Sequence, residues 1–102
     1  MALDRAAFCE TVWALVAGTP PGKVISYGQL ALLAGRPDAP RLAGWAMRRA
    51  PAELPCHRVV HTDGSLAPTE LFHGLQRQML EQEGVVFTPA GRVNMRLSAY
   101  GT

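Results

Sequence analysis

The stretch Ser26–Arg49, which reads SYGQLALLAGRPDAPRLAGWAMRR, decides the fold of this chain. Its opening S-x-x-Q pattern is a capping box, and it predicts a short helix that continues through Ala34 and is closed by Gly35. Asp38 is expected to cap a second helix over Ala39–Arg49, whose first turn tolerates a proline. Two short helices around a tight turn, the second rich in arginine, are typical of a helix-turn-helix. An ordinary hairpin of two packed helices has the same pattern and stays open as the alternative.

A longer helix is predicted before this stretch, with Asp4 as its cap and Gly18 as its end. Apolar residues recur inside it at positions i, i+4, i+7 and i+8, namely Phe8, Val12, Leu15 and Val16. This stripe is expected to face the core. Lys23–Ile25, which follows, is expected to be extended.

Beyond the stretch, short apolar runs alternate with turn signals, a pattern typical of small hairpins. The predicted elements are a strand at Arg58–His61, a hairpin turn at Thr62–Ser65, a helix at Gly74–Gln82, and a closing hairpin from Val85–Phe87 and Arg92–Met95. The whole pattern predicts a mainly α fold with small β-hairpins (α+β). We expect a single winged helix-turn-helix-like DNA-binding domain over residues 1–102.

The composition indicates one globular, intracellular domain. Of 102 residues, 48% are hydrophobic and 18% are charged, which argues against a disordered chain and leaves room for one modest core. Met1–Arg5 lacks the apolar run of a signal peptide, and no stretch approaches membrane-spanning length, so no membrane partner is expected. Cys9 and Cys56 are expected to stay reduced in such a compartment.

Positive charge is concentrated in the middle of the chain, although the net charge is only +2. Lys23–Arg58 contains six basic residues against Asp38 and Glu53, whereas Thr62–Glu83 is acidic. A basic section suits a phosphate backbone. Arginines that are merely solvated at helix ends would give the same count, so charge alone leaves both interpretations open.

The run Leu54–Val60, LPCHRVV, places a thiol beside an imidazole and behind a proline. The proline restricts the backbone and can present Cys56 in a defined direction. His57 can take the proton of the thiol, directly or through a water, which would make Cys56 a nucleophile. A lone cysteine is more often a small buried hydrophobe, so the pair needs support from its context. His61 and His73 complete no standard zinc pattern with this pair, so we expect no metal.

Four groups of residues occur in a recognisable order and spacing. They are Lys23–Ala31 (KVISYGQLA), Arg41 with Gly44 and Ala46–Arg48, Pro55–Val59 (PCHRV), and Glu83–Gly84. Together they resemble the C-terminal, DNA-binding domain of the O6-alkylguanine-DNA alkyltransferases, over about residues 8–87.

The resemblance implies a DNA repair protein that flips O6-alkylguanine out of duplex DNA and transfers the alkyl group irreversibly to its own cysteine. In this methylated-DNA–protein-cysteine methyltransferase, Cys56 would be the nucleophile, His57 would take the proton through a water, and Glu83 would orient the imidazole. The thioether that forms is inert, so the protein would act once per molecule and would need no metal and no other cofactor.

The resemblance also implies which residues meet the substrate. The second helix of the helix-turn-helix would lie in the minor groove, and Arg41 would enter the base stack in place of the flipped nucleotide. The further residues implied at the DNA are Ala43 and Ala46, which would allow close approach, with Arg48 and Arg49. Those implied at the flipped base are Tyr27, Met47 and the backbone carbonyls of Cys56 and Val59.

Several features depart from this family and resemble the alkyltransferase-like proteins, which bind O6-alkylguanine without repairing it. Ala50 stands where the family has an asparagine, and Trp45 where it commonly has a small residue. The loop Ala67–Gly74 lacks the family's Tyr-Ser-Gly-Gly run, and Gln76–Gln78 is similar to the alkyltransferase-like segment. That subfamily typically has tryptophan in place of the nucleophile, however, and this chain has Cys56.

We therefore expect alkyl transfer to Cys56 as the main activity of a monomer that binds duplex DNA containing O6-alkylguanine. The alternative is lesion binding without transfer, with nucleotide excision repair proteins as further partners. A helix-turn-helix regulator with an incidental thiol is a third interpretation, and it would bind specific undamaged sequences.

Overall fold

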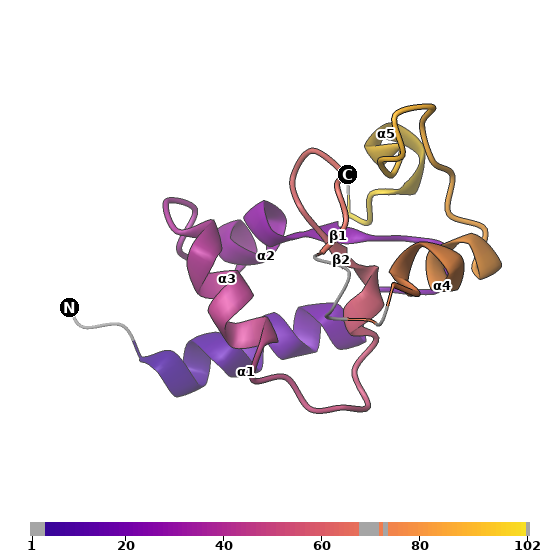
Figure 1. The fold of residues 1–102 in the computed structure, drawn as a ribbon. Helices are drawn as coiled ribbons and strands as arrows, with labels where there is room; N and C mark the ends of the chain where they lie inside the picture. The colour runs from indigo at the N-terminus through magenta and orange to yellow at the C-terminus, as the bar shows by residue number, and fades with distance from the viewer. Residues whose placement is uncertain (1–3, 68–71, 73, 102) are drawn as a thin grey trace.

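The computed structural model describes residues 4–67, 72 and 74–101, and over these residues the chain is mainly helical (Figure 1). The elements in order are α1 (Arg5–Ala17), β1 (Ile25–Ser26), α2 (Tyr27–Leu33), α3 (Pro40–Met47), the 3-10 turn η1 (Cys56–Arg58), β2 (Val59–Val60), α4 (Gln76–Gln82) and α5 (Met95–Ser98). No helix within the described residues is both long and apolar enough to cross a membrane. The predicted α+β helix-turn-helix class is confirmed.

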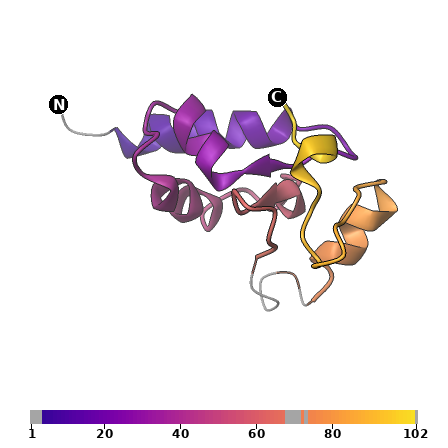
Figure 2. The same ribbon diagram turned by 90° about the horizontal axis from the view of Figure 1, so that it is seen from above.

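A two-stranded parallel sheet lies between two hydrophobic clusters. Ile25 of β1 is paired with Val59 of β2. Both side chains belong to the cluster formed with α1, α2 and α3, whereas Val24 and Val60 belong to the cluster of the C-terminal half. Successive side chains of a strand point to opposite faces, so two short strands can bury apolar residues on both sides. Figures 1 and 2 show α1 to α3 on one side of the sheet and α4 and α5 on the other.

The predicted strand at Arg58–His61 forms as β2, but the prediction that it belongs to a hairpin is wrong, because β2 pairs with β1 rather than with the chain that follows. The turn itself forms, since the amide of His61 donates to the carbonyl of Ser65 at 3.0 Å. Gly64 has a φ of +86°, and a Cβ there would lie 2.5 Å from the carbonyl oxygen of Val93. The turn therefore packs on the C-terminal half instead of leading into a second strand.

The first helix agrees with its prediction. The side chain of Asp4 accepts a hydrogen bond from the amide of Ala7 at 3.1 Å. Phe8, Val12 and Val16 of the predicted stripe are buried, and Leu15 packs against the same cluster. The apolar spacing therefore identified the face of α1 that contacts α2 and α3.

The helix-turn-helix forms as α2 and α3, with one predicted cap confirmed and one wrong. The hydroxyl of Ser26 accepts from the amide of Gln29 at 3.0 Å. Ala39, not Asp38, is the N-cap of α3, and it makes no side-chain cap bond. The carboxylate of Asp38 instead contacts Arg36 at 3.3 Å. The helix ends at Met47, two residues before the predicted end.

Replacing Ser26 by alanine is expected to lower the free energy of unfolding by about 1 kcal/mol, because an orphan amide of α2 loses its partner. Urea denaturation would measure the change. Asp38→Ala is the matched control, and it should leave the midpoint unchanged because the structure shows no cap there. Equal losses in both variants would contradict this assignment of the caps.

The C-terminal half closes with the predicted hairpin, in a minimal form. Phe87 and Val93 form an antiparallel bridge, and the amide of Thr88 donates to the carbonyl of Arg92 at 2.7 Å. Met95, expected in the second strand, begins α5 instead. The cause is local, since the side chain of Asn94 caps this helix through the amide of Leu97 at 3.3 Å.

Candidate functional site

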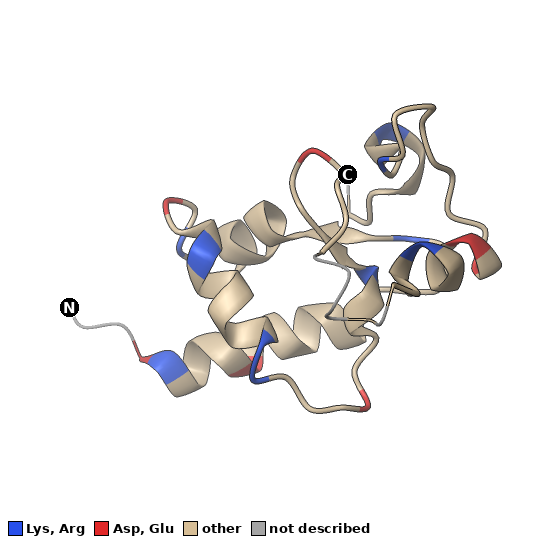
Figure 3. Cartoon of the chain, in the orientation of Figure 1, with Lys and Arg blue, Asp and Glu red and all other residues tan. Residues whose placement is uncertain are grey.

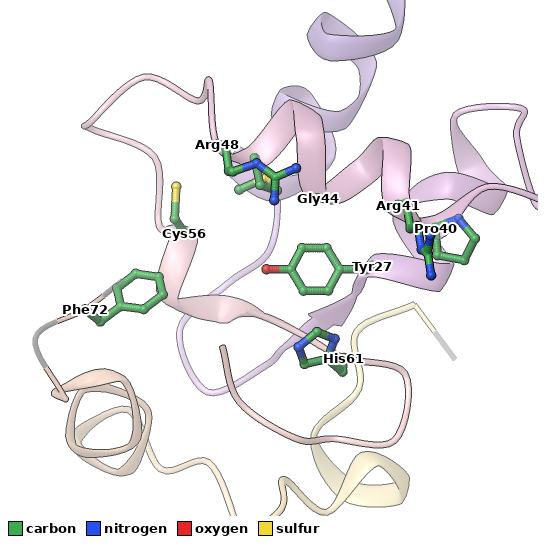
Figure 4. Close-up of a pocket in the computed structure, with 9 residues that line it drawn as sticks. Tyr27, Pro40, Arg41, Gly44, Arg48, Cys56, His61 and Phe72 are labelled. Carbon is green, nitrogen blue, oxygen red and sulfur yellow. The ribbon is translucent and has the colours of Figure 1, made fainter. Parts of the chain in front are cut away.

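A cavity of about 810 Å³ opens between α2, α3 and the segment that carries η1 (Figure 4). Its wall is formed by Tyr27, Pro40, Arg41, Gly44, Met47, Arg48, Cys56, His61 and Phe72. Five of these were predicted as site residues from the sequence, namely Tyr27, Arg41, Met47, Arg48 and Cys56. The fold therefore brings these five residues from three separate segments to one concave surface.

The Cys56 thiol lies in the cavity wall, at the first position of η1 and directly after Pro55. It is partly exposed. Burial raises the pKa of this thiol above its ordinary value, so the neutral form is favoured in the free protein. Within the described residues, no hydrogen bond joins the sulfur to His57.

His57 and Glu83 lie outside the cavity wall and belong to a separate ionic group, which we call the Glu83 cluster: His57, Arg58, Glu83 and the carbonyl of Thr19. His57 Nε2 lies 2.8 Å from Glu83 Oε2. Arg58 donates to both oxygens of Glu83, at 3.0 and 2.8 Å, and to the carbonyl of Thr19 at 3.0 Å. These side chains are between 12% and 17% exposed.

The hydrogen bond from Arg58 is the largest cause that lowers the pKa of Glu83 to about 2. An ionised carboxylate can only accept hydrogen bonds, so the proton of the shared bond belongs to Nε2 of His57. The other ring nitrogen, Nδ1, is then the one that can accept a proton. The cluster thus fixes the tautomer of the imidazole that follows Cys56 in the chain.

Tyr27 crosses the cavity with its hydroxyl toward the side of Cys56, and His61 lies against its ring (Figure 4). The two ring centroids are 5.1 Å apart. Burial is the main cause that raises the pKa of Tyr27, so its hydroxyl stays protonated and can donate a hydrogen bond to a ligand.

The side chains of Ala43 and Ala46 are fully buried in the first hydrophobic cluster, so they do not line the cavity. That they allow close approach of DNA stays a prediction. Gly44 is the small residue of α3 that lines the cavity. Arg49 is also turned to other contacts. It donates to the carbonyl of Trp45 at 3.1 Å, and its guanidinium lies 4.2 Å from the centre of that ring.

Val59, which was expected to bind the base through its carbonyl, is buried in β2 and is absent from the cavity wall. Its carbonyl accepts a hydrogen bond from Nε2 of Gln76 at 3.1 Å. One of the two acceptor positions of this oxygen is therefore already occupied in the free protein.

Most basic residues of the middle section are engaged elsewhere, by Asp38, the Glu83 cluster, Trp45 or the carbonyl of Leu97. Basic residues lie at both ends of α3 (Figure 3). Arg41 and Arg48 are exposed and line the cavity. Neither side chain has a hydrogen bond or an ion pair within the described residues.

Six residues near the site were not among the predicted site residues. Gln76 is buried and Arg58 is largely buried among polar partners, whereas Pro40, Gly44, His61 and Phe72 line the cavity. The carboxylate partner of Arg58 was visible in the sequence as Glu83, but nothing in the sequence placed the two together. Among residues 4–67, 72 and 74–101 no group of three His, Cys, Asp or Glu could hold a metal, and His73 lies outside the described residues.

Comparisons with known proteins agree with this geometry. The family model for the 6-O-methylguanine DNA methyltransferase, DNA binding domain, matches residues 7–85. The chain is 39% identical over 92 residues to the DNA base-flipping protein of Escherichia coli, covering 88% of this chain and 71% of that protein. It is 35% identical to alkyltransferase-like protein 1 of Schizosaccharomyces pombe, covering 91% and 92%.

Solved structures give the same result. One similar structure is the crystal structure of S. pombe Atl1 in complex with damaged DNA containing O6-carboxymethylguanine, with a TM-score of 0.77. The sequences are 31% identical, and the match covers all of both chains. The O6-methylguanine methyltransferase of Mycobacterium tuberculosis has a TM-score of 0.65 and 33% identity, over 81% of this chain and 50% of that one. The chain belongs to the family of 6-O-methylguanine DNA methyltransferase DNA-binding domains.

Proposed function

We propose that this protein binds O6-alkylguanine that has been flipped out of duplex DNA into the cavity beside α3. The observation that carries the proposal is the cavity itself, because it is open and lies between Arg41, Arg48 and the Cys56 thiol. Its volume of about 810 Å³ is within the range of sites that hold a small molecule. Flipping is least costly for a damaged, weakly paired base, which adds selectivity for the lesion.

Two observations favour binding without transfer over the alkyl transfer that the sequence predicted. The first is that burial raises the pKa of the Cys56 thiol above its ordinary value, which disfavours the nucleophilic thiolate. The relatives that the chain covers over most of their length are named as a base-flipping and an alkyltransferase-like protein. Passing the lesion to nucleotide excision repair proteins stays a prediction.

Fluorescence anisotropy with two duplexes, identical except for one O6-methylguanine, tests the proposal. We expect at least tenfold tighter binding of the damaged duplex, which corresponds to about 1.4 kcal/mol. The preference should persist in Cys56→Ala, because binding does not use the thiolate. Equal affinity for both duplexes would refute the proposal.

Alkyl transfer to Cys56 is the second candidate, and the position of the thiol in the cavity wall favours it. In this reaction the thiol proton would pass to His57 through a water, and the sulfur would form a bond to the alkyl carbon. The bond from that carbon to O6 would break with its electron pair left on O6, and the guanine, which stays in the DNA, would take up a proton from solvent. Mass spectrometry of the intact protein after incubation with the damaged duplex separates the candidates. One added methyl group on the peptide with Cys56 supports transfer, and tight binding with unchanged mass supports the first proposal.

Replacing Gly44 by alanine is expected to stabilise the free protein and to weaken lesion binding. Nothing lies within 4 Å of a Cβ at this position, and alanine is favoured over glycine in a helix by about 1 kcal/mol. The added methyl group would project into the surface that we propose meets the DNA. Thermal denaturation and anisotropy measure the two effects, and a stabilised variant with unchanged affinity would exclude close approach of DNA at Gly44.

A further inference from the structure

Gln76, the first residue of α4, is buried at 4% exposure and uses both ends of its amide. Its Nε2 donates to the carbonyls of His57 and Val59, at 3.0 and 3.1 Å. Its Oε1 accepts from the backbone amide of Ala67 at 2.9 Å. A buried polar side chain with every bond satisfied holds its neighbours in one arrangement, because any shift would leave a desolvated group unpaired.

These three bonds join two parts of the chain that border the cavity. The carbonyl of His57 lies in η1, which begins with Cys56, and the carbonyl of Val59 lies at the start of β2. The amide of Ala67 follows the turn that carries His61. Among the side-chain hydrogen bonds of the described residues, only those from Gln76 are accepted by the main chain of Cys56–Val59.

We propose that Gln76 is a positioning residue that fixes the Cys56 turn against the Ala67 segment and thereby sets the shape of the cavity wall. The inference rests on the proposed function for its effect on DNA. Gln76 itself does not line the cavity. Gln76 acts by holding the backbone segments that position the side chains of Cys56 and His61.

The chemistry of the site requires an amide. Two carbonyls need donors and one amide needs an acceptor, and glutamine supplies all three from one side chain. In Gln76→Glu the ionised carboxylate keeps the acceptor, loses both donors and faces two carbonyl oxygens. When protonated, the carboxyl group recovers one donor, and burial raises the pKa at which this happens.

The first experiment measures the affinity ratio between damaged and undamaged duplexes for Gln76→Glu, relative to the wild type at the same pH. We expect the ratio to fall on the order of tenfold at pH 8 and to recover in part below about pH 6. Gln76→Met has neither the donors nor the acceptor, so its affinity ratio between damaged and undamaged duplexes should be reduced at both pH values. Gln78→Glu is the matched control on the exposed side of α4 and should behave as the wild type.

The second experiment needs no DNA, and it separates failure of this inference from failure of the proposed function. The rate at which iodoacetamide alkylates Cys56 reports the order of the turn, and the buried Cys9 is an internal control for global unfolding. We expect several-fold faster alkylation of Cys56 in both Gln76 variants, with Cys9 still protected. Wild-type rates in the Gln76 variants would overturn the inference, whatever the wild-type protein does with damaged DNA.

Discussion

Replacing Arg58 by methionine is expected to lower the free energy of unfolding by about 3 kcal/mol at pH 7, because the variant leaves a largely buried carboxylate with one partner fewer. The side chains of Arg58 and Glu83 are only 14% and 17% exposed. Methionine keeps most of the length of arginine, so the loss reports the hydrogen bonds to Glu83 and Thr19 more than an empty space. Urea denaturation followed by circular dichroism would measure it.

The matched control removes another arginine that pairs with a carboxylate, this time at the surface. Arg92 lies 3.8 Å from Asp63, and both side chains are more than half exposed. Solvent screens such pairs, so Arg92→Met should leave the unfolding midpoint nearly unchanged. Equal losses in the two variants would contradict a special role of the Glu83 cluster.

The same cluster predicts how stability depends on pH. The native pKa of Glu83 is about 2, below the value of 4.5 for an unperturbed glutamate, so the unfolded chain binds its proton first as the pH falls. The stabilisation is therefore complete above about pH 4.5 and is lost as the pH falls toward 2, by about 3 kcal/mol in total. In Arg58→Met the native pKa is higher, so the stability difference between variant and wild type should narrow over this range.

Local signals in the sequence predicted local structure. The caps of α1 and α2 and the buried face of α1 depend on residues within one or two turns of each other, and Asp4, Ser26 and Phe8 were assigned correctly. Asp38 failed as a cap because its neighbour Arg36 competes for its carboxylate. The parallel pairing of β1 with β2 joins segments more than thirty residues apart, and the pattern of each segment alone gives no partner.

The cavity residues that could be predicted from the sequence are those implied by its resemblance to a known family. Tyr27, Arg41, Met47, Arg48 and Cys56 meet at one cavity. Which face of α3 is buried was harder to predict, because the small side chains of Ala43 and Ala46 could either pack in the core or face a ligand. The structure shows both of them in the core. Gln76 and Arg58 lie in motifs that were quoted from the sequence, but their roles could not be predicted from it. Their partners are backbone carbonyls and a carboxylate from other segments, which only the folded chain brings together.

Replacing Arg41 by alanine is expected to weaken binding of the damaged duplex by about 2 kcal/mol, on the order of thirtyfold. The guanidinium is exposed, lies at the cavity and has no protein partner among the described residues, so it is available to a phosphate or to the gap left by a flipped base. Its loss should also reduce the salt dependence of binding, since one fewer counterion is released. Anisotropy titrations at several salt concentrations would measure both effects.

Arg96→Ala is the control for this prediction, because it removes the same charge from an exposed site in α5, away from the cavity. If Arg41 acts only through net charge, the two variants should lose equal affinity for damaged and undamaged duplexes. If Arg41 supports a flipped base, its removal should cost more affinity for the damaged duplex than for the undamaged one, whereas Arg96→Ala should affect both alike. A uniform loss in Arg41→Ala would place this side chain on the phosphate backbone and remove it from the flipping step.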